Sequence, residues 1–204
     1  MESVTSLFAI VNTLRYGAGM DDKLNRQHWL GAGLEVLAAQ GLQGLRIMPI
    51  AQQLGVTKGS FYWHFGNLDE YQVALLQEWE QRHTQQIIQY VDSQGGDALT
   101  KLRNLMTVTV NADARLAKAI RSWADTNPLA HAAQSRVDYD RLVYLHSLLT
   151  QLGWADDKAQ TFARWMYCAL IGHFNLQGPA ILTAQIEFVL ETLTPTPAIK
   201  HPTR

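Results

Sequence analysis

The chain has 204 residues, of which 47% are hydrophobic and 17% charged, a composition that can bury a sizeable core and excludes a disordered chain. Its 17 Lys and Arg residues against 18 Asp and Glu leave a formal net charge of -1, so the overall charge gives no sign of a nucleic-acid or anionic-membrane partner. The one cysteine, Cys168, excludes an intrachain disulfide framework and a cysteine-based zinc finger. Any indication of DNA binding must therefore be local.

Apolar segments are too short to cross a bilayer. The most apolar run, residues 165–172, falls well short of the roughly 20 residues that a spanning helix needs. The apolar stretch 7–11 follows Glu2 and ends at Asn12, which does not fit a secretory signal. We therefore expect a soluble cytoplasmic protein without a membrane partner.

The sequence predicts an all-α protein, because apolar residues recur at helical spacing and no sustained strand alternation is present. Glycines and prolines punctuate the pattern. The first 20 residues lack clear helix caps, and we expect them to form a poorly ordered extension. The expected helices span residues 23–40, 48–54, 57–64, 68–91, 98–110, 113–124, 130–152, 156–176 and 181–193.

Several single residues carry local expectations. Gly31 and Gly33 lie inside the first helix at a cost of about 1 kcal/mol each relative to Ala, which indicates that another element packs closely there. Asn67 and Glu70 have the spacing of a capping box, in which each side chain binds the other residue's free backbone amide. The apolar surroundings of Cys168 favour a buried thiol over a nucleophile.

Residues 50–65, IAQQLGVTKGSFYWHF, predict a helix-turn-helix motif in which two short helices meet at Gly55. In such a motif the first helix supports the second against the major groove, where base edges can be read. Hydroxyl groups and a cation on the second helix suit contacts with phosphates and base edges. The apolar residues expected to face inward are Ile50, Ala51, Leu54, Val56 and Phe61, and those able to face outward are Thr57, Lys58, Ser60, Tyr62 and Trp63.

The run GVTKGSFYWHF at residues 55–65 closely resembles the recognition region of TetR-family transcriptional regulators. The flanking pairs Trp29-Leu30 and Asp69-Glu70 agree with this, and the resemblance covers about residues 23–75. A thinner resemblance to one branch of the family continues through short motifs between residues 121 and 153. The resemblance implies an N-terminal three-helix helix-turn-helix DNA-binding domain and a C-terminal helical domain for ligand binding and dimerisation.

The same resemblance implies a role for each contact residue. Thr57 and Lys58 begin the recognition helix, Tyr62 and His64 hold phosphates, and Ser60 and Trp63 touch bases or sugars. Arg46 stands where the family has an N-cap Thr and could still reach a phosphate. Leu68 replaces a frequent basic residue, which removes one expected backbone contact. The expected DNA-binding residues are Arg46, Thr57, Lys58, Gly59, Ser60, Tyr62, Trp63 and His64, whereas Phe65 belongs to the core.

The expected DNA-binding arm is only weakly basic. Between residues 20 and 67, four Lys and Arg face three Asp and Glu, which leaves a local charge of +1. Two arms in a dimer double the contacts, and backbone amides at helix starts add donors. We therefore expect a shallow salt dependence of DNA binding.

The resemblance places the helix-turn-helix domain at residues 21–67 and an effector-binding and dimerisation domain at 68–204, joined by the long helix 68–91. Helices 156–176 and 181–193 are expected to pair with their copies in a homodimer. A small-molecule effector, apolar or aromatic, is expected to tilt the long helix and release operator DNA, as in a repressor. Candidate effector-binding residues, each of which could instead fill the core, are Trp123, Tyr144, His146, Phe162, Trp165 and His173.

Two other classes of protein are alternatives. An enzyme is not expected, because the chain lacks the common zinc, serine-nucleophile and phosphate-loop motifs. Glu80 and His83 match one Glu-x-x-His unit of di-iron bundles, but such sites need two units and two further carboxylates, so we expect a solvated helix face and no metal or cofactor. An all-helical small-molecule-binding or adaptor protein without DNA binding would explain the helices but not the KGSFY stretch after Gly55.

Overall fold

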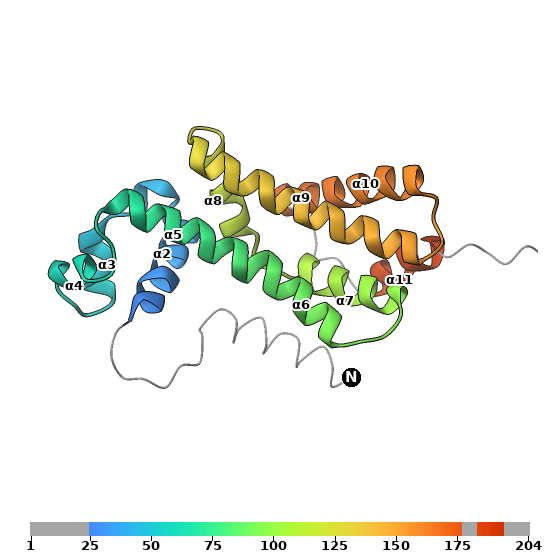
Figure 1. Ribbon diagram of the computed structural model, residues 1–204, viewed down its shortest axis with the longest axis horizontal. Coiled ribbons are helices and arrows are strands. Elements are labelled where there is room, and N and C mark those ends of the chain that lie inside the picture. The colour runs from blue at the N-terminus through green and yellow to red at the C-terminus, as the bar shows by residue number, and fades with distance from the viewer. Residues whose placement is uncertain (1–24, 177–182, 194–204) are drawn as a thin grey trace, which may run out of the picture.

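The computed structural model describes residues 25–176 and 183–193, and every regular element among them is a helix (Figure 1). The N-terminal elements are α2 (Arg26–Gln40), the 3-10 turn η1 (Leu42–Gly44), α3 (Ile47–Gln53) and α4 (Lys58–Tyr62). A long helix follows, formed by α5 (Leu68–Glu80), the π-helical segment η2 (Gln81–Gln85) and α6 (Gln86–Ser93). The remaining helices are α7 (Ala98–Val110), α8 (Ala114–Ala124), α9 (Pro128–Gln151), α10 (Asp156–Asn175) and α11 (Thr183–Leu193).

The predicted all-α fold is confirmed, and the predicted helices agree with the observed ones to within one turn. Pro128, expected only as a breaker, occupies the first turn of α9, where its missing amide costs nothing, and the side chain of Asn127 caps that helix. The π-helical turn inside the long helix was not predicted. The extension expected at residues 1–20 lies outside the described residues.

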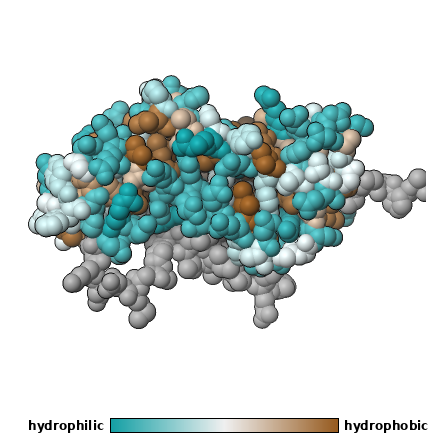
Figure 2. Space-filling view, viewed as in Figure 1, coloured by the Kyte–Doolittle hydropathy of each residue, from teal (hydrophilic) through white to brown (hydrophobic). Residues whose placement is uncertain are grey.

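The helices form an elongated molecule in which α3 and α4 lie at one end (Figure 1). The long helix α5–η2–α6 runs from that end along the molecule toward α7, and α9 and α10 pack side by side at the other end. Helix α8 contacts both α9 and α2, so it joins the two parts of the chain. The tip formed by α3 and α4 is pale in Figure 2, which marks residues of intermediate hydropathy.

Two hydrophobic clusters hold the helices together. The first combines α2 to α5 with α8 and the start of α9, through residues such as Trp29, Trp79 and Ile120. The second joins α7, α9, α10 and α11, and Leu102 and Leu148 are buried in it. The first cluster therefore continues past residue 67, where the sequence places the end of the DNA-binding domain.

The two helix glycines have different environments. A Cβ built on Gly33 would lie 2.1 Å from the hydroxyl of Tyr71, which confirms the expected close approach. A Cβ on Gly31 would meet nothing within 4 Å, so the same expectation is wrong there. At the start of α5, the amide of Glu70 donates to Asn67 Oδ1, at 2.8 Å. The Glu70 carboxylate accepts from Gly66 N instead of Asn67 N, so the capping box is displaced by one residue.

None of the helices in the described part of the chain is both long and apolar enough to cross a membrane.

The last described helix, α11, is fixed by an ion pair as well as by packing. Arg103 on α7 donates two hydrogen bonds to the carboxylate of Glu187 on α11, at 2.7 and 3.0 Å. The neighbouring guanidinium lowers the pKa of Glu187 below its usual value.

Candidate functional site

A cluster of aromatic rings positions the short helix α4. Phe61, from the middle of α4, is fully buried, and its ring centre lies 5.4 Å from that of Trp29 and 5.3 Å from that of Tyr71. Phe65 joins the cluster as predicted, and Tyr71 donates a hydrogen bond to the backbone oxygen of Trp29. A five-residue helix has little stability alone, so this packing fixes its orientation.

The opposite face of α4 is open to solvent. Trp63 is 88% exposed and Tyr62 51% exposed, although indole and phenol rings are usually covered in a folded protein. Thr57, Lys58 and Gly59 are exposed beside them, and the Lys58 ammonium lies 5.9 Å from the centre of the Tyr62 ring. The five residues expected to face outward do so, except that Ser60 is half-buried, as is His64.

The inward positions follow the helix-turn-helix expectation. Ile50, Ala51 and Phe61 are buried, and Leu54 and Val56 pack against the same cluster. These contacts fix the angle between α3 and α4, which determines how α4 is presented to a partner.

The two positions that depart from the expected pattern have distinct roles. Arg46 is the N-cap residue of α3, but its side chain caps no amide there; its Nε donates to the backbone oxygen of Gln43 at 3.1 Å. The side chain is exposed, so the guanidinium is accessible to a partner molecule. Leu68 packs against the first hydrophobic cluster. The chain thus uses this position for burial rather than for a cation.

A pocket lies among the helices of the second part of the chain. The empty space between these helices is about 810 Å³ when the open mouth and the solvent in it are included. Its walls come from the long helix, α7, α8, α9 and α10. Most of the lining is apolar and includes Trp79, Ile87, Leu105, Leu116, Leu170 and Phe174.

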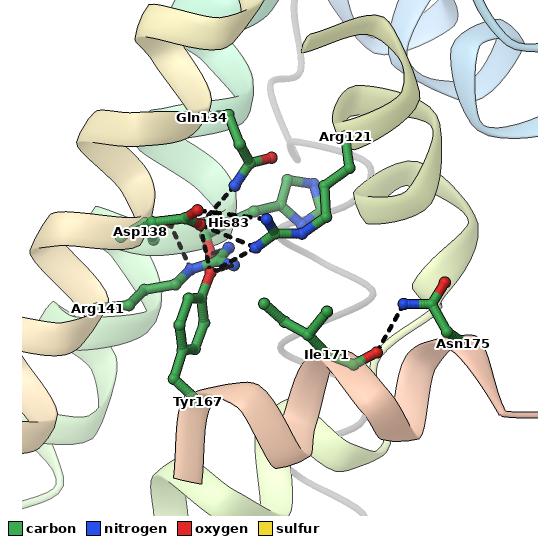
Figure 3. Close-up of polar contacts among 9 residues, drawn as sticks. His83, Arg121, Gln134, Asp138, Arg141, Tyr167, Ile171 and Asn175 are labelled. Atoms are coloured by element: carbon green, nitrogen blue, oxygen red, sulfur yellow. Dashed lines mark hydrogen bonds and ion pairs between the residues drawn. The ribbon is translucent and has the colours of Figure 1, made fainter. Parts of the chain in front are cut away.

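Arg141 connects this pocket to the π-helical segment of the long helix (Figure 3). Its Nη2 donates to the backbone oxygen of His83 at 2.9 Å, and its Nε donates to the hydroxyl of Thr84 at 3.2 Å. A π turn disrupts the regular helical ladder, and such turns occur frequently at functional sites. Arg141 on α9 thus binds two residues of the π turn, His83 and Thr84, which also line the pocket.

A polar network holds Arg141 in place and joins α8, α9 and α10. Arg121 forms a bidentate ion pair with Asp138, with the shorter contact at 2.8 Å. Tyr167 donates to Asp138 Oδ1 at 2.6 Å and accepts from Arg121 at 2.9 Å and Arg141 at 3.3 Å. Gln134 also donates to Asp138. Burial raises the pKa of Tyr167, so the phenol stays protonated at neutral pH.

The residues proposed from sequence for effector binding are distributed over several sites. Tyr144 lines the pocket, where it donates to Asp92 Oδ1 at 3.0 Å, and burial raises its pKa. Trp123 is buried in the first cluster. His146 contacts Asp156, and His173 lies 3.2 Å from the oxygen of Val110. Phe162 stacks on Trp165 with ring centres 5.3 Å apart. Apart from Tyr144, these residues are not in the lining of this pocket.

Apart from Tyr144, sequence reasoning did not propose the polar residues Arg141, Thr84 and His83, which also line the pocket. Arg141 carried a signal, because it belongs to a motif of the suggested family branch. For Thr84 and His83 the sequence carries no signal of a place in the pocket, because their position depends on the unpredicted π turn. Glu80, expected on a solvated face with His83, is half-buried and pairs with Arg136.

Helices α10 and α11 each expose a large apolar ring. Trp165 on α10 is 60% exposed and Phe188 on α11 is 67% exposed. Cys168, one turn along α10 from Trp165, is also exposed, so the expectation of a buried thiol is wrong. The apolar run in α10 misled that expectation, because one side of the helix packs inward while the other carries apolar residues outward.

This geometry defines a class of protein: a helix-turn-helix unit with an exposed recognition helix, attached to an all-helical domain that contains a pocket. Comparison with known proteins identifies the helix-turn-helix region. Residues 30–70 match the family model described as bacterial regulatory proteins, tetR family. This part of the chain is therefore similar to the DNA-binding region of the TetR family of transcriptional regulators.

Individual relatives share mainly the DNA-binding region. The chain is 44% identical over 54 residues to the uncharacterized HTH-type transcriptional regulator TtgW of Pseudomonas putida, which is 26% of this chain and 40% of the relative. It is 38% identical over 61 residues to the tetracycline repressor protein class D of Escherichia coli, 30% of this chain and 28% of the relative. The match thus spans less than half of each relative.

The likeness in fold extends further than the likeness in sequence. The crystal structure of reduced NemR from E. coli superposes with a TM-score of 0.67 over 85% of this chain and 99% of that one, at 18% identity. At this identity the likeness shows the fold alone. Both parts of the chain therefore share the fold of that structure, whereas sequence similarity to curated relatives is concentrated in the helix-turn-helix unit.

Proposed function

We propose that this protein is a ligand-responsive transcriptional regulator that binds operator DNA as a homodimer and represses until a small molecule releases it. The observation that carries the DNA-binding role is the exposed face of α4, where Tyr62 and Trp63 stand in solvent above the buried ring of Phe61. A helix that is buried on one side and presents aromatic and hydroxyl groups on the other suits contact with phosphates and the edges of DNA bases. We propose that it acts in the cytoplasm, where bacterial operator DNA lies.

Dimerisation is the second part of the proposal. One arm has too few base contacts for strong specificity, and a pair of arms can address two half-sites about 34 to 36 Å apart. Exposed apolar groups such as Trp165 and Phe188 on α10 and α11 are more typical of an interface than of a free surface. These two helices therefore supply the proposed homodimer contact.

The third part of the proposal is the response to a ligand. The pocket is lined by Trp79 and Ile87 of the long helix, whose other end begins directly after the helix-turn-helix. It is also lined by Leu116 of α8, which belongs to the same hydrophobic cluster as α2. A ligand that shifts either helix would move the DNA-binding unit, so occupancy of the pocket and DNA affinity are linked.

A gel-shift assay tests DNA binding directly. Purified protein is titrated into a labelled DNA fragment that flanks its own gene, at low and physiological salt, with an unrelated fragment of equal length as competitor. Specific retardation of the flanking fragment is expected. Failure to shift any flanking fragment, even at low salt, would favour the alternative of an all-helical ligand-binding or adaptor protein without DNA binding.

A further inference from the structure

The charges around the pocket are not balanced. All three hydrogen bonds that Arg141 donates go to uncharged oxygens, those of His83, Thr84 and Tyr167. Tyr167 links Arg141 to Asp138, but that carboxylate already forms a bidentate ion pair with Arg121. Among the residues that the structure describes, two guanidinium groups therefore share one carboxylate, which leaves one positive charge at the pocket wall.

The acidic residue on the pocket lining does not cancel this charge. Asp113 caps α8 by accepting from the amide of Arg115, and its carboxylate also pairs with the guanidinium of Arg115 at 2.7 Å. That pair is neutral as a unit. His83, which also lines the pocket, adds no negative charge in either protonation state.

We propose that the effector is an amphipathic organic anion: an aromatic or aliphatic body with one acidic group, which pairs with Arg141. This deepens the proposed function and rests on it, because it names the ligand class of the pocket that is proposed to control DNA binding. A guanidinium in a partly buried site binds a carboxylate or sulfonate strongly through paired hydrogen bonds.

The rest of the pocket suits the apolar body of such a ligand. Ile87 and Leu105 face it from the long helix and α7, and Leu170 and Phe174 from α10. Burying a ring system against these side chains would supply the bulk of the affinity, while the single cationic group would orient the ligand. A neutral compound of the same shape would leave the charge of Arg141 without its counterion.

The anion would also compete for a structural contact. Arg141 binds the carbonyl of His83 and the hydroxyl of Thr84, both in the π turn of the long helix. An acidic group that draws the guanidinium toward the pocket would weaken these bonds and loosen the turn. The same interaction would thus serve recognition and release of DNA.

Two fluorescent probes test the ligand class in the intact protein. 8-Anilinonaphthalene-1-sulfonate and N-phenyl-1-naphthylamine have the same aromatic frame, and only the first carries a sulfonate. Both gain fluorescence when buried, so titration gives a Kd for each. The inference predicts that the wild-type protein binds the sulfonate at least about tenfold more tightly.

Three variants assign this preference to the pocket. Arg141→Gln should abolish the preference for the sulfonate while leaving the Kd of the neutral probe nearly unchanged, whereas Arg141→Lys should keep part of it. Arg164→Gln, a matched change of an exposed arginine on α10, should alter neither Kd. Ala117→Phe, which fills the pocket, should weaken both probes.

The opposite results are equally specific. Equal or tighter binding of the neutral probe by the wild type would overturn the inference. So would a sulfonate preference that survives Arg141→Gln, or fluorescence that Ala117→Phe leaves unchanged, because the probe would then bind elsewhere. Gel shifts with the same wild-type preparation distinguish the proposal of DNA binding from the proposal of an anionic ligand. DNA binding without a preference for the anionic probe would overturn the ligand class and leave the proposed regulatory function standing.

Discussion

Arg141 Nη2 donates a hydrogen bond of 2.9 Å to the backbone oxygen of His83, which ties α9 to the π-helical turn of the long helix. A regular α-helix pairs this carbonyl within its own backbone ladder. In this chain a side chain from a neighbouring helix also binds it, and Thr84 next to it is held by the same guanidinium. The turn is therefore stabilised by tertiary contacts.

The first prediction concerns this support. Thr84→Val keeps the shape of the buried side chain but removes the oxygen that accepts from Arg141, so unfolding free energy should fall by about 1–2 kcal/mol. Urea denaturation measures the loss, and hydrogen exchange should accelerate at residues 81–86. Thr107→Val, which removes a hydroxyl bonded only to its own helix, is the control and should change stability less. Equal effects of the two changes would contradict the assigned role of Thr84.

The second prediction concerns the close contact of α2 with α5. Gly33→Ala would place a methyl group against the hydroxyl of Tyr71 and displace the side chain that binds Trp29, so it should destabilise the protein by about 1–3 kcal/mol. Gly31→Ala is matched in chemistry and helix but meets no neighbour, so it should stabilise by about 0.5–1 kcal/mol. Thermal unfolding of both variants checks the contrast, and a stable Gly33→Ala protein would show that Tyr71 can move freely.

The third prediction tests a phosphate contact. Tyr62→Ala should weaken operator binding about tenfold and to a similar degree on different DNA sequences, because a phosphate contact carries no sequence information. Fluorescence anisotropy with two operator variants gives the comparison. Tyr139→Ala removes a tyrosine on α9 that is even more exposed than Tyr62, and it should leave binding unchanged. Parental affinity in Tyr62→Ala would remove this residue from the DNA contacts.

The fourth prediction separates specificity from affinity. Trp63, which directly follows α4, is 88% exposed, so its replacement by Ala should cost little stability and should change which operator sequence is preferred. Selection of bound sequences from a randomised DNA pool measures the preference. A weaker binder with the same preferred sequence would assign Trp63 to the DNA backbone instead.

The fifth prediction addresses self-association. Trp165→Arg places a charge at an exposed ring of α10 and should convert the proposed dimer to monomer, with loss of operator binding. Tyr139→Arg introduces the same charge at an equally exposed ring outside α10 and α11, and should leave the dimer intact. Sedimentation velocity reports the molecular mass of each variant. A Trp165→Arg protein that remains dimeric would move the interface to another surface.

Much of the fold could be predicted from sequence because helix signals are local. Asn67, Gly153 and the spacing of apolar residues determine where helices begin and end, and these signals act within a few residues. The inward face of the helix-turn-helix followed from the same periodicity: Phe61 and Phe65 are buried and Trp63 is exposed.

The pocket could not be predicted in the same way. Periodicity shows that Trp123 and Phe162 lie on apolar stripes, but not whether a stripe faces a core, a pocket or a partner. The π turn adds a residue to one helical turn and thereby rotates the side chains that follow it. Its stabilisation by Arg141 comes from a helix more than fifty positions away in the chain, a contact that no local pattern encodes.

The first hydrophobic cluster has a consequence for how the protein unfolds. It unites Trp29 of the DNA-binding unit with Ile120 of α8 and Val137 of α9 in one buried set. A fragment cut after residue 67 would lose the packing of α2 against α5 and α8 and should not fold by itself. The helix-turn-helix unit and the helical domain that contains the pocket would then unfold in a single cooperative transition. A compound that stabilises the pocket would therefore also raise the temperature at which the helix-turn-helix unit unfolds.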